Sequence, residues 1–254
     1  MSPAFFEIHR ALPREGPGDR QSLDWALRMA ALPKDAAILD AGCGPGADIP
    51  ALLTHAPQGR VRAVDLHGPF VWHVQARFGF DRRVTAVHGD MTAQNGPFDF
   101  IWSAGAVYAV GIGPAMAAFR RMLRPGGRVA FSHLCWTGAE RPAEAAAFWA
   151  GEAPEMADLD TTQAQIAAAG GRVLGRTLVS PQGWAAYYGP LEARIAALEA
   201  AVAEGRGAEG QGGNRADDID DADMAEQLAA HRREIEVWQA HGDSYGYAVF
   251  LVAP

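Results

Sequence analysis

The feature that most constrains the fold is an apolar run that ends in an acidic residue and enters a glycine-rich turn. Residues 36–39 form the run, Asp40 follows, and Gly42, Gly44 and Gly46 come directly afterwards. A short apolar run of this kind is typical of a strand buried in a parallel sheet. Glycines let the backbone turn sharply and approach a ligand without a Cβ in the way. The stretch therefore predicts an α/β sheet with a ligand-binding loop at the end of a strand.

The spacing of these glycines separates two kinds of nucleotide-containing ligand. The dinucleotide fingerprint is G-x-G-x-x-G, which opens a helix whose N-terminus holds a pyrophosphate. Here the glycines run G-x-G-x-G, and Asp40 precedes them. An acidic residue favours a cationic ligand over a phosphate. We therefore expect a nucleoside-bearing cofactor other than a nicotinamide dinucleotide.

The pattern from Asp40 to Gly46 resembles motif I of the class I S-adenosylmethionine (SAM)-dependent methyltransferases. Four further segments agree with that family in the same order along the chain. They are residues 61–65, residues 84–91, residues 98–103 and residues 123–131. The resemblance implies a doubly wound, Rossmann-like α/β fold with a seven-stranded, mostly parallel sheet and an antiparallel final strand.

The resemblance also implies which residues hold SAM. Asp65 would accept the ribose hydroxyls, Asp90 would contact the adenine amino group, and Arg14 would pair with the methionine carboxylate. Asp65 as a turn cap, Asp90 as a plain turn former and Arg14 as an exposed side chain remain open alternatives. The cofactor-binding residues expected from the resemblance are Asp40, Gly42, Gly44, Gly46, Asp65, Leu66, Asp90, Met91, Ser103 and Arg14.

Two segments outside the sheet indicate a narrower resemblance. Residues 5–18 and residues 140–144 are similar to segments of a bacterial subgroup of these methyltransferases that acts on small molecules and has no defined acceptor. Members of that subgroup carry a Glu after the serine of the fifth strand, whereas this chain has His133 after Ser132. We expect residues 1–18 to form a lid, and we take His9 and His133 as candidate catalytic bases, with a surface or hydrogen-bonded histidine as the alternative.

The spacing of apolar and helix-breaking residues predicts the remaining elements. We expect helices over residues 20–32, 49–53, 68–78, 114–123 and 162–169, and the last two strands over residues 172–179 and 245–252. The connection between those two strands is far longer than usual, so residues 181–243 should form a helical cap insertion with a mobile stretch at residues 205–221. Trp184, Tyr187 and Tyr188 either fill the core beneath the cap or line an acceptor pocket.

Composition limits what else the chain can be. A length of 254 residues with 49% hydrophobic content is enough for a single α/β domain that spans residues 1–254. A formal charge of −8 opposes binding to a nucleic-acid backbone. The two cysteines have no metal-site or disulfide spacing, and we expect no metal site. The sequence has no secretion-signal pattern and no apolar run long enough to span a membrane, which predicts a cytoplasmic protein without membrane partners.

These observations predict a SAM-dependent methyltransferase that moves a methyl group to a small-molecule acceptor by direct in-line transfer. The methyl group of SAM is already activated, so the protein must mainly orient the acceptor; a base is needed only if the acceptor must lose a proton. A non-catalytic SAM-binding regulator or assembly factor is one alternative. A nicotinamide-dependent oxidoreductase on a similar sheet is another, which the glycine spacing disfavours. The oligomeric state is left open.

Overall fold

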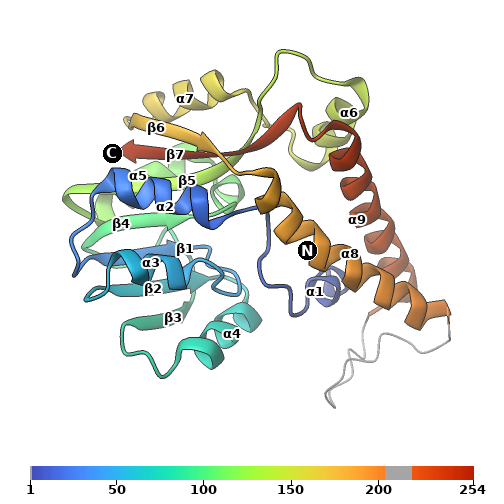
Figure 1. The fold of residues 1–254 in the computed structure, drawn as a ribbon, viewed down its shortest axis with the longest axis horizontal. Coiled ribbons are helices and arrows are strands. Elements are labelled where there is room, and N and C mark those ends of the chain that lie inside the picture. Colours follow the sequence, from blue (N-terminus) through green and yellow to red (C-terminus); the bar gives the residue numbers. More distant parts are fainter. Residues whose placement is uncertain (1, 204–218) are drawn as a thin grey trace.

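The sheet contains seven strands in the order β3-β2-β1-β4-β5-β7-β6. The computed structural model describes residues 2–203 and 219–254. The strands are β1 (Ala37–Ala41), β2 (Arg60–Asp65), β3 (Val84–His88), β4 (Phe98–Ser103), β5 (Leu123–Trp136), β6 (Arg172–Leu178) and β7 (Tyr245–Ala253). Strands β1 to β5 pair in parallel, and β7 runs antiparallel between β5 and β6. The predicted fold class is confirmed (Figure 1).

Helices cover both faces of the sheet. They are α2 (Arg20–Ala30), α3 (Ile49–His55), α4 (Gly68–Phe78), α5 (Ile112–Met122), α6 (Ala143–Glu152) and α7 (Leu159–Ala168). Apolar side chains of α2, α3 and α4 share one core cluster with one face of the sheet, and those of α5 and α7 share a second cluster with the other face. Helices α3, α4 and α5 supply the crossovers of the parallel pairs β1–β2, β2–β3 and β4–β5.

The predicted elements match the observed ones closely where local chemistry sets their ends. The helix expected over residues 68–78 has those bounds. The helix expected over residues 20–32 begins after Asp19, whose side chain accepts from the Ser22 amide, but it ends at Ala30 because Ala31 adopts the left-handed conformation with φ 49°. Helix α7 begins three residues earlier than expected, because Asp158 rather than a later residue caps it.

The cap insertion is built from two long helices. They are α8 (Pro181–Ala203) and α9 (Asp221–His241), which pack against each other and, together, against the short N-terminal helix α1 (Pro3–Ile8). Figure 1 shows both helices extending beyond the end of the sheet, with α1 beside them. The helical insertion before the last strand is as predicted. The stretch expected to be mobile falls on residues 205–218, outside the described residues, and on residues 219–221 at the start of α9.

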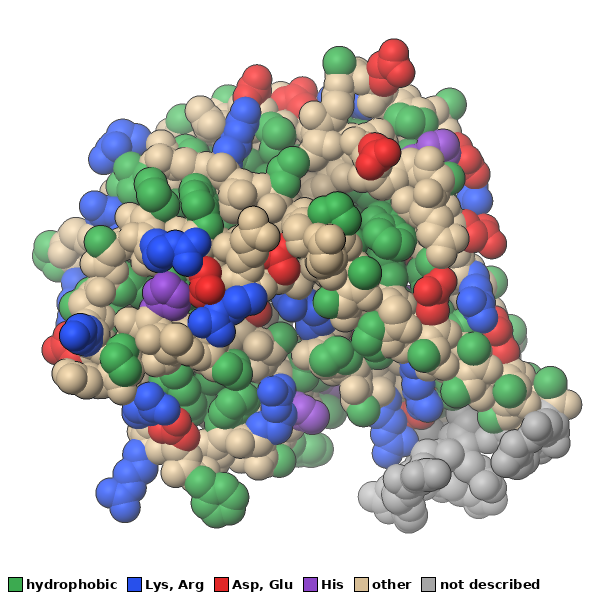
Figure 2. Space-filling model, viewed as in Figure 1, with side chains coloured by type: hydrophobic (Ala, Val, Ile, Leu, Met, Phe, Trp, Pro, Cys, Tyr) green, Lys and Arg blue, Asp and Glu red, His purple; other side chains and the backbone are tan. Residues whose placement is uncertain are grey.

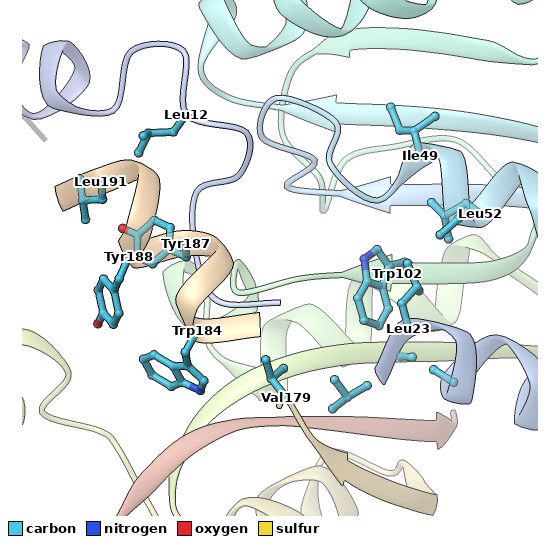
Figure 3. Packing of buried hydrophobic residues seen from close by; sticks show 14 of the residues in the cluster. Leu12, Leu23, Ile49, Leu52, Trp102, Val179, Trp184, Tyr187, Tyr188 and Leu191 are labelled. Atoms are coloured by element: carbon cyan, nitrogen blue, oxygen red, sulfur yellow. The ribbon is translucent and has the colours of Figure 1, made fainter. Parts of the chain in front are cut away.

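Aromatic side chains join the cap to the sheet. Trp184 is 5% exposed and stacks on Trp238 of α9 with ring centroids 6.1 Å apart. Tyr187 and Tyr188 are buried in the same cluster (Figure 3). The suggestion that these residues line an acceptor pocket is therefore wrong for Trp184 and Tyr188, because they pack against the cap and β7 instead of facing the cavity described below. Tyr187 also lies outside the lining of that cavity.

Candidate functional site

A cavity of about 340 Å³ lies at the carboxyl ends of β1, β2, β3 and β4. Ligands in open α/β folds bind at this edge of the sheet. The loops that follow the four strands form its floor, and residues 5, 6 and 14–17 of the N-terminal segment form its other wall. Of the residues predicted to bind a cofactor, the cavity brings together Asp40, Gly42, Gly44, Asp65, Leu66, Asp90, Met91 and Arg14.

Gly42 and Gly44 shape the glycine loop, because each has a positive φ and a close neighbour where a Cβ would lie. Gly42 has φ 73°, and a Cβ there would lie 2.4 Å from the Cβ of Ala106. Its amide and the amide of Cys43 both donate to the carbonyl oxygen of Val64. Gly44 has φ 51°, and a Cβ there would lie 3.2 Å from Cγ of Glu15. Close packing between three separate segments therefore requires these glycines.

Asp40 is the most unusual charged group in the cavity. It is 2% exposed, and its Oδ2 has no hydrogen-bond partner within the described residues. Burial raises the pKa of Asp40 well above its ordinary value, and the nearby carboxylates of Asp48 and Asp65 raise it further. A buried carboxylate in this situation is relieved by a neighbouring cation. The floor of the cavity is thus suited to a positively charged ligand.

The carboxylates of Asp65, at the end of β2, and Asp90, after β3, have hydrogen-bond partners within the protein. Asp65 accepts from the Gly44 amide at 2.8 Å through Oδ2 and from the His67 amide at 2.8 Å through Oδ1. Oδ1 of Asp90 accepts from both the amide and the hydroxyl of Thr92. Both residues therefore act as turn formers, as the alternative interpretation held. Each carboxylate has two lone pairs on each oxygen, so both keep the capacity to accept from a ligand.

Arg14 brings a positive charge to the acidic floor. Its Nη2 lies 3.6 Å from Oδ1 of Asp48, and its Nε donates to the carbonyl oxygen of Gly16 at 2.7 Å. The guanidinium packs so closely on Gly18 that a Cβ there would lie 2.1 Å from Nη2. The N-terminal segment is therefore fixed over the glycine loop by a charged contact and by a residue without a side chain.

Four predicted site residues lie outside this cavity, and His9 is described separately below. Gly46 packs against α3 and α4, where a Cβ would lie 2.9 Å from Ile49. Ser103 is fully buried, and its hydroxyl donates to the carbonyl oxygen of Ala41, which ties β4 to β1. His133 lies on the face of β5 that also carries Phe131, which packs toward α5 and α7. Burial lowers the pKa of His133.

His9 lies directly behind the cavity wall. It is 2% exposed, and Phe5 stacks on it with ring centroids 4.0 Å apart. Its Nδ1 is 2.7 Å from Oε2 of Glu15, and its Nε2 is 2.9 Å from Nε2 of His231 in α9. His9 also borders a second hollow of about 700 Å³, and Glu15 lines both this hollow and the first cavity.

Sequence reasoning missed Glu15 and His231, the two residues whose side chains contact the ring nitrogens of His9. Glu15 lines the cavity, and burial raises its pKa although His9 opposes the rise. Its position beside Arg14 in the segment predicted to be a lid was the one available signal. His231 carried no signal, because it lies in a cap helix 222 residues from its partner His9.

An aromatic contact closes the cavity on the side of α4. The rings of Phe6 and His67 stack with centroids 3.7 Å apart and planes 3° from parallel, and Phe70 meets His67 edge-on. Phe6, His67 and Phe70 all line the cavity. The N-terminal segment is therefore attached to the floor by apolar as well as charged contacts.

The central part of the chain matches a known family. Residues 38–127 match the family described as a methyltransferase domain. A malonyl-[acyl-carrier protein] O-methyltransferase of Pseudescherichia vulneris is 34% identical over 116 residues, which are 45% of each chain. An enzyme of the same name from Salmonella typhimurium is 30% identical over 131 residues, 51% of this chain and 49% of that protein. The chain thus aligns with about half the length of the curated relatives it matches.

Solved structures resemble the whole chain in fold. A SAM-dependent methyltransferase from Geobacter sulfurreducens, in complex with S-adenosyl-L-homocysteine, has a TM-score of 0.78 and 21% identity and covers 100% of this chain and 98% of its own. YjhP from E. coli has a TM-score of 0.77 and 20% identity, with 99% of each chain covered. The fold and the domain match define a class I SAM-dependent methyltransferase fold, as predicted. Residues 38–127 are the part of the chain that matches the methyltransferase domain family.

Proposed function

We propose that this protein is an enzyme that binds SAM and transfers its methyl group directly, in line, to a small-molecule acceptor. The observation that carries the proposal is the buried Oδ2 of Asp40, which has no hydrogen-bond partner within the described residues and lies in the cavity of a methyltransferase domain. SAM carries a positive charge on its sulfonium and another on its ammonium group. Such a ligand would compensate the buried carboxylate.

The residues of the cavity would each hold a different part of SAM. Asp40 and Arg14 would take the charged methionine end, Asp65 the ribose hydroxyls, and Asp90 with Met91 the adenine. When bound, SAM would supply a methyl group that its sulfonium already activates. The protein's own contribution is to orient the acceptor and to exclude water, and the lid residues Phe6 and Arg14, held against the floor, suit that task.

A small-molecule acceptor is supported by the charge of the protein. The formal charge is −8, and on the face shown in Figure 2 the Lys and Arg side chains alternate with Asp and Glu instead of forming one basic patch. Binding to a nucleic-acid backbone needs such a patch. No helix of residues 2–203 or 219–254 combines the length and apolarity needed to cross a membrane. We also propose a cytoplasmic location, because Cys43 and Cys135 are free thiols.

Calorimetry with S-adenosylhomocysteine tests the proposal. The wild type should bind it, and Asp40→Asn should weaken binding of SAM by tenfold or more, because the variant removes the charge that faces the cation (about 1.4 kcal/mol or more). Asp160→Asn is the matched control, since Asp160 is exposed and pairs with Arg176 far from the cavity. A wild type that binds nicotinamide cofactors and not S-adenosylhomocysteine would overturn the assignment. Tight binding without transfer to any acceptor would favour the regulator alternative.

A further inference from the structure

A continuous hydrogen-bonded array runs from the cavity wall into the cap. Oε2 of Glu15 is 2.7 Å from Nδ1 of His9, Nε2 of His9 is 2.9 Å from Nε2 of His231, and Nδ1 of His231 is 2.6 Å from the carbonyl oxygen of Gln227. We call Glu15, His9 and His231 the relay. Its members come from the lid segment, the end of α1 and the middle of α9.

The donor and acceptor roles of its members fix how many protons the relay holds. A carbonyl oxygen only accepts, so Nδ1 of His231 carries a hydrogen and donates to Gln227. If His231 is neutral, its Nε2 accepts, and His9 must donate from Nε2. A neutral His9 then has a lone pair at Nδ1, so Glu15 must be protonated to complete the array.

Two other arrangements complete the array equally well. His9 can be doubly protonated beside a Glu15 carboxylate, or His231 can be doubly protonated while a neutral His9 donates to Glu15 from Nδ1. In every arrangement the relay contains one proton more than a carboxylate and two neutral histidines. When that proton leaves, one contact of 2.7–2.9 Å faces two acceptors and no longer has a hydrogen. The deprotonated relay therefore lacks one hydrogen bond, and the uptake of one proton restores it.

The surroundings favour the uptake of this proton by the deprotonated relay. His9 and His231 are 2% and 6% exposed, and Phe5 and Tyr187 flank the His9 ring. Burial raises the pKa of Glu15 and lowers that of His231. Other titratable and charged groups on the elements around the relay are Glu7 of α1, Tyr187 and Arg194 of α8, Glu234 of α9 and Asp65 at the end of β2. Arg194 is engaged by Glu7, and the others add negative or neutral groups, which favours retention of a proton.

We propose that Glu15 is the base of the site and that His9 and His231 share the proton it takes. The inference rests on the proposed function. In the step, a lone pair of the acceptor oxygen or nitrogen forms the bond to the methyl carbon and the carbon–sulfur bond breaks with its electrons left on sulfur. The acceptor's O–H or N–H proton moves to Glu15, which completes the relay.

The proposal narrows the class of acceptor. A carboxylate acceptor is already deprotonated and gives the relay nothing to take up. It would also bring a negative charge toward Glu15, Asp40 and Asp65, which share the cavity. A hydroxyl or an amine satisfies both conditions. We therefore infer that the acceptor is a nucleophile that loses a proton and not the carboxylate of a malonyl group, the group after which the curated relatives are named.

A nuclear magnetic resonance titration of isotope-labelled histidines, from about pH 5 to 9, tests the relay. The ring nitrogens of His9 and His231 should titrate together, with Nδ1 of His231 protonated throughout. Glu15→Gln should abolish this titration, because the amide donates a hydrogen to His9 and completes the array without an extra proton. Glu199→Gln is the control, since Glu199 pairs with Arg232 next to His231 but lies outside the relay; it should leave the titration unchanged.

Binding and transfer measurements on the same proteins complete the test. Glu15→Gln should bind S-adenosylhomocysteine within about threefold of the wild type and lower kcat for hydroxyl or amine acceptors about 100-fold, with loss of the acidic limb of the pH profile. Independent titration of the two histidines, tenfold weaker S-adenosylhomocysteine binding by Glu15→Gln, or undiminished transfer by that variant to hydroxyl and amine acceptors would each overturn the proposal. A wild type that does not bind S-adenosylhomocysteine would instead contradict the proposed function. The histidine titration would still test the relay, because it needs no bound ligand.

Discussion

The two walls of the cavity are built in different ways. The floor consists of loops that directly follow neighbouring parallel strands, and its shape depends on backbone conformation at positions such as Gly42. The opposite wall is the N-terminal segment, which we propose to be a lid and which is supported by side chains of α8 and α9 that lie far away in the sequence. The match to the methyltransferase family covers residues 38–127, which include the floor but neither the lid nor the cap. The floor thus lies in the part of the chain that matches the family, whereas the N-terminal segment and the cap lie outside that part.

The largest effect on stability is expected when the aromatic contact between the cap and the sheet is removed. Trp184→Ala should lower the free energy of unfolding by about 4 kcal/mol, because it leaves a cavity among Tyr188, Trp238 and Tyr245. Urea denaturation measures the loss, and calorimetry should show little change in S-adenosylhomocysteine affinity while the protein is folded. Trp72→Ala is the control, since Trp72 is 67% exposed and its removal should cost less than about 0.5 kcal/mol. Unchanged stability with lost binding would instead indicate that Trp184 contacts the ligand.

A smaller effect is expected from the floor, but there it should affect binding as well. Gly42→Ala should cost about 2–3 kcal/mol, because φ is 73° and the new Cβ would lie 2.4 Å from the Cβ of Ala106. Binding of S-adenosylhomocysteine should be lost with it. Gly113→Ala in α5 is the control; nothing lies within 4 Å of its Cβ position, so the variant should gain about 0.5–1 kcal/mol. Normal binding by Gly42→Ala would show that the loop tolerates a side chain and that the floor is less constrained than we infer.

The smallest effect concerns the pH dependence that the floor imposes. The pKa of Asp40 is raised in the folded protein, so the folded state binds more protons than the unfolded state between the ordinary pKa of 3.8 and the raised value. Its contribution to stability is present at low pH and is lost as the pH rises through the folded pKa. Asp40→Asn should therefore gain stability relative to the wild type as the pH increases, and saturating SAM should reduce the gap. A constant difference from acid to neutral pH, measured by denaturation, would contradict a burial-raised pKa.

Much of the fold followed from local patterns. The strand and glycine turn at residues 36–46 and the helix over residues 68–78 were predicted because apolar runs, caps and glycines limit the backbone within a few residues. The cofactor residues were predicted from the family resemblance, and seven of the eight that meet in the cavity lie at or just after the carboxyl ends of parallel strands. Their binding roles remain proposals.

The rest depended on which side chains face each other across the folded chain. His133 was placed correctly near the end of a strand, but strand alternation turns it toward the face that packs with α5 and α7. Trp184 was a pocket candidate until the packing of α8 on β7 and α9 buried it. Helical spacing within residues 181–203 does not reveal what a cap helix packs against, so it could not separate core from pocket.

By itself, the sequence determined the class of fold, the turn that forms the floor and the acidic, cation-favouring character of the cavity. These are consequences of backbone sterics and of charges carried by contiguous residues, which act over short distances along the chain. Only the tertiary structure decided that Glu15 meets His9 and that His9 meets His231 across 222 residues of sequence. Such contacts arise when packing excludes water and leaves buried polar groups to satisfy one another, and no local pattern specifies which partners they will find.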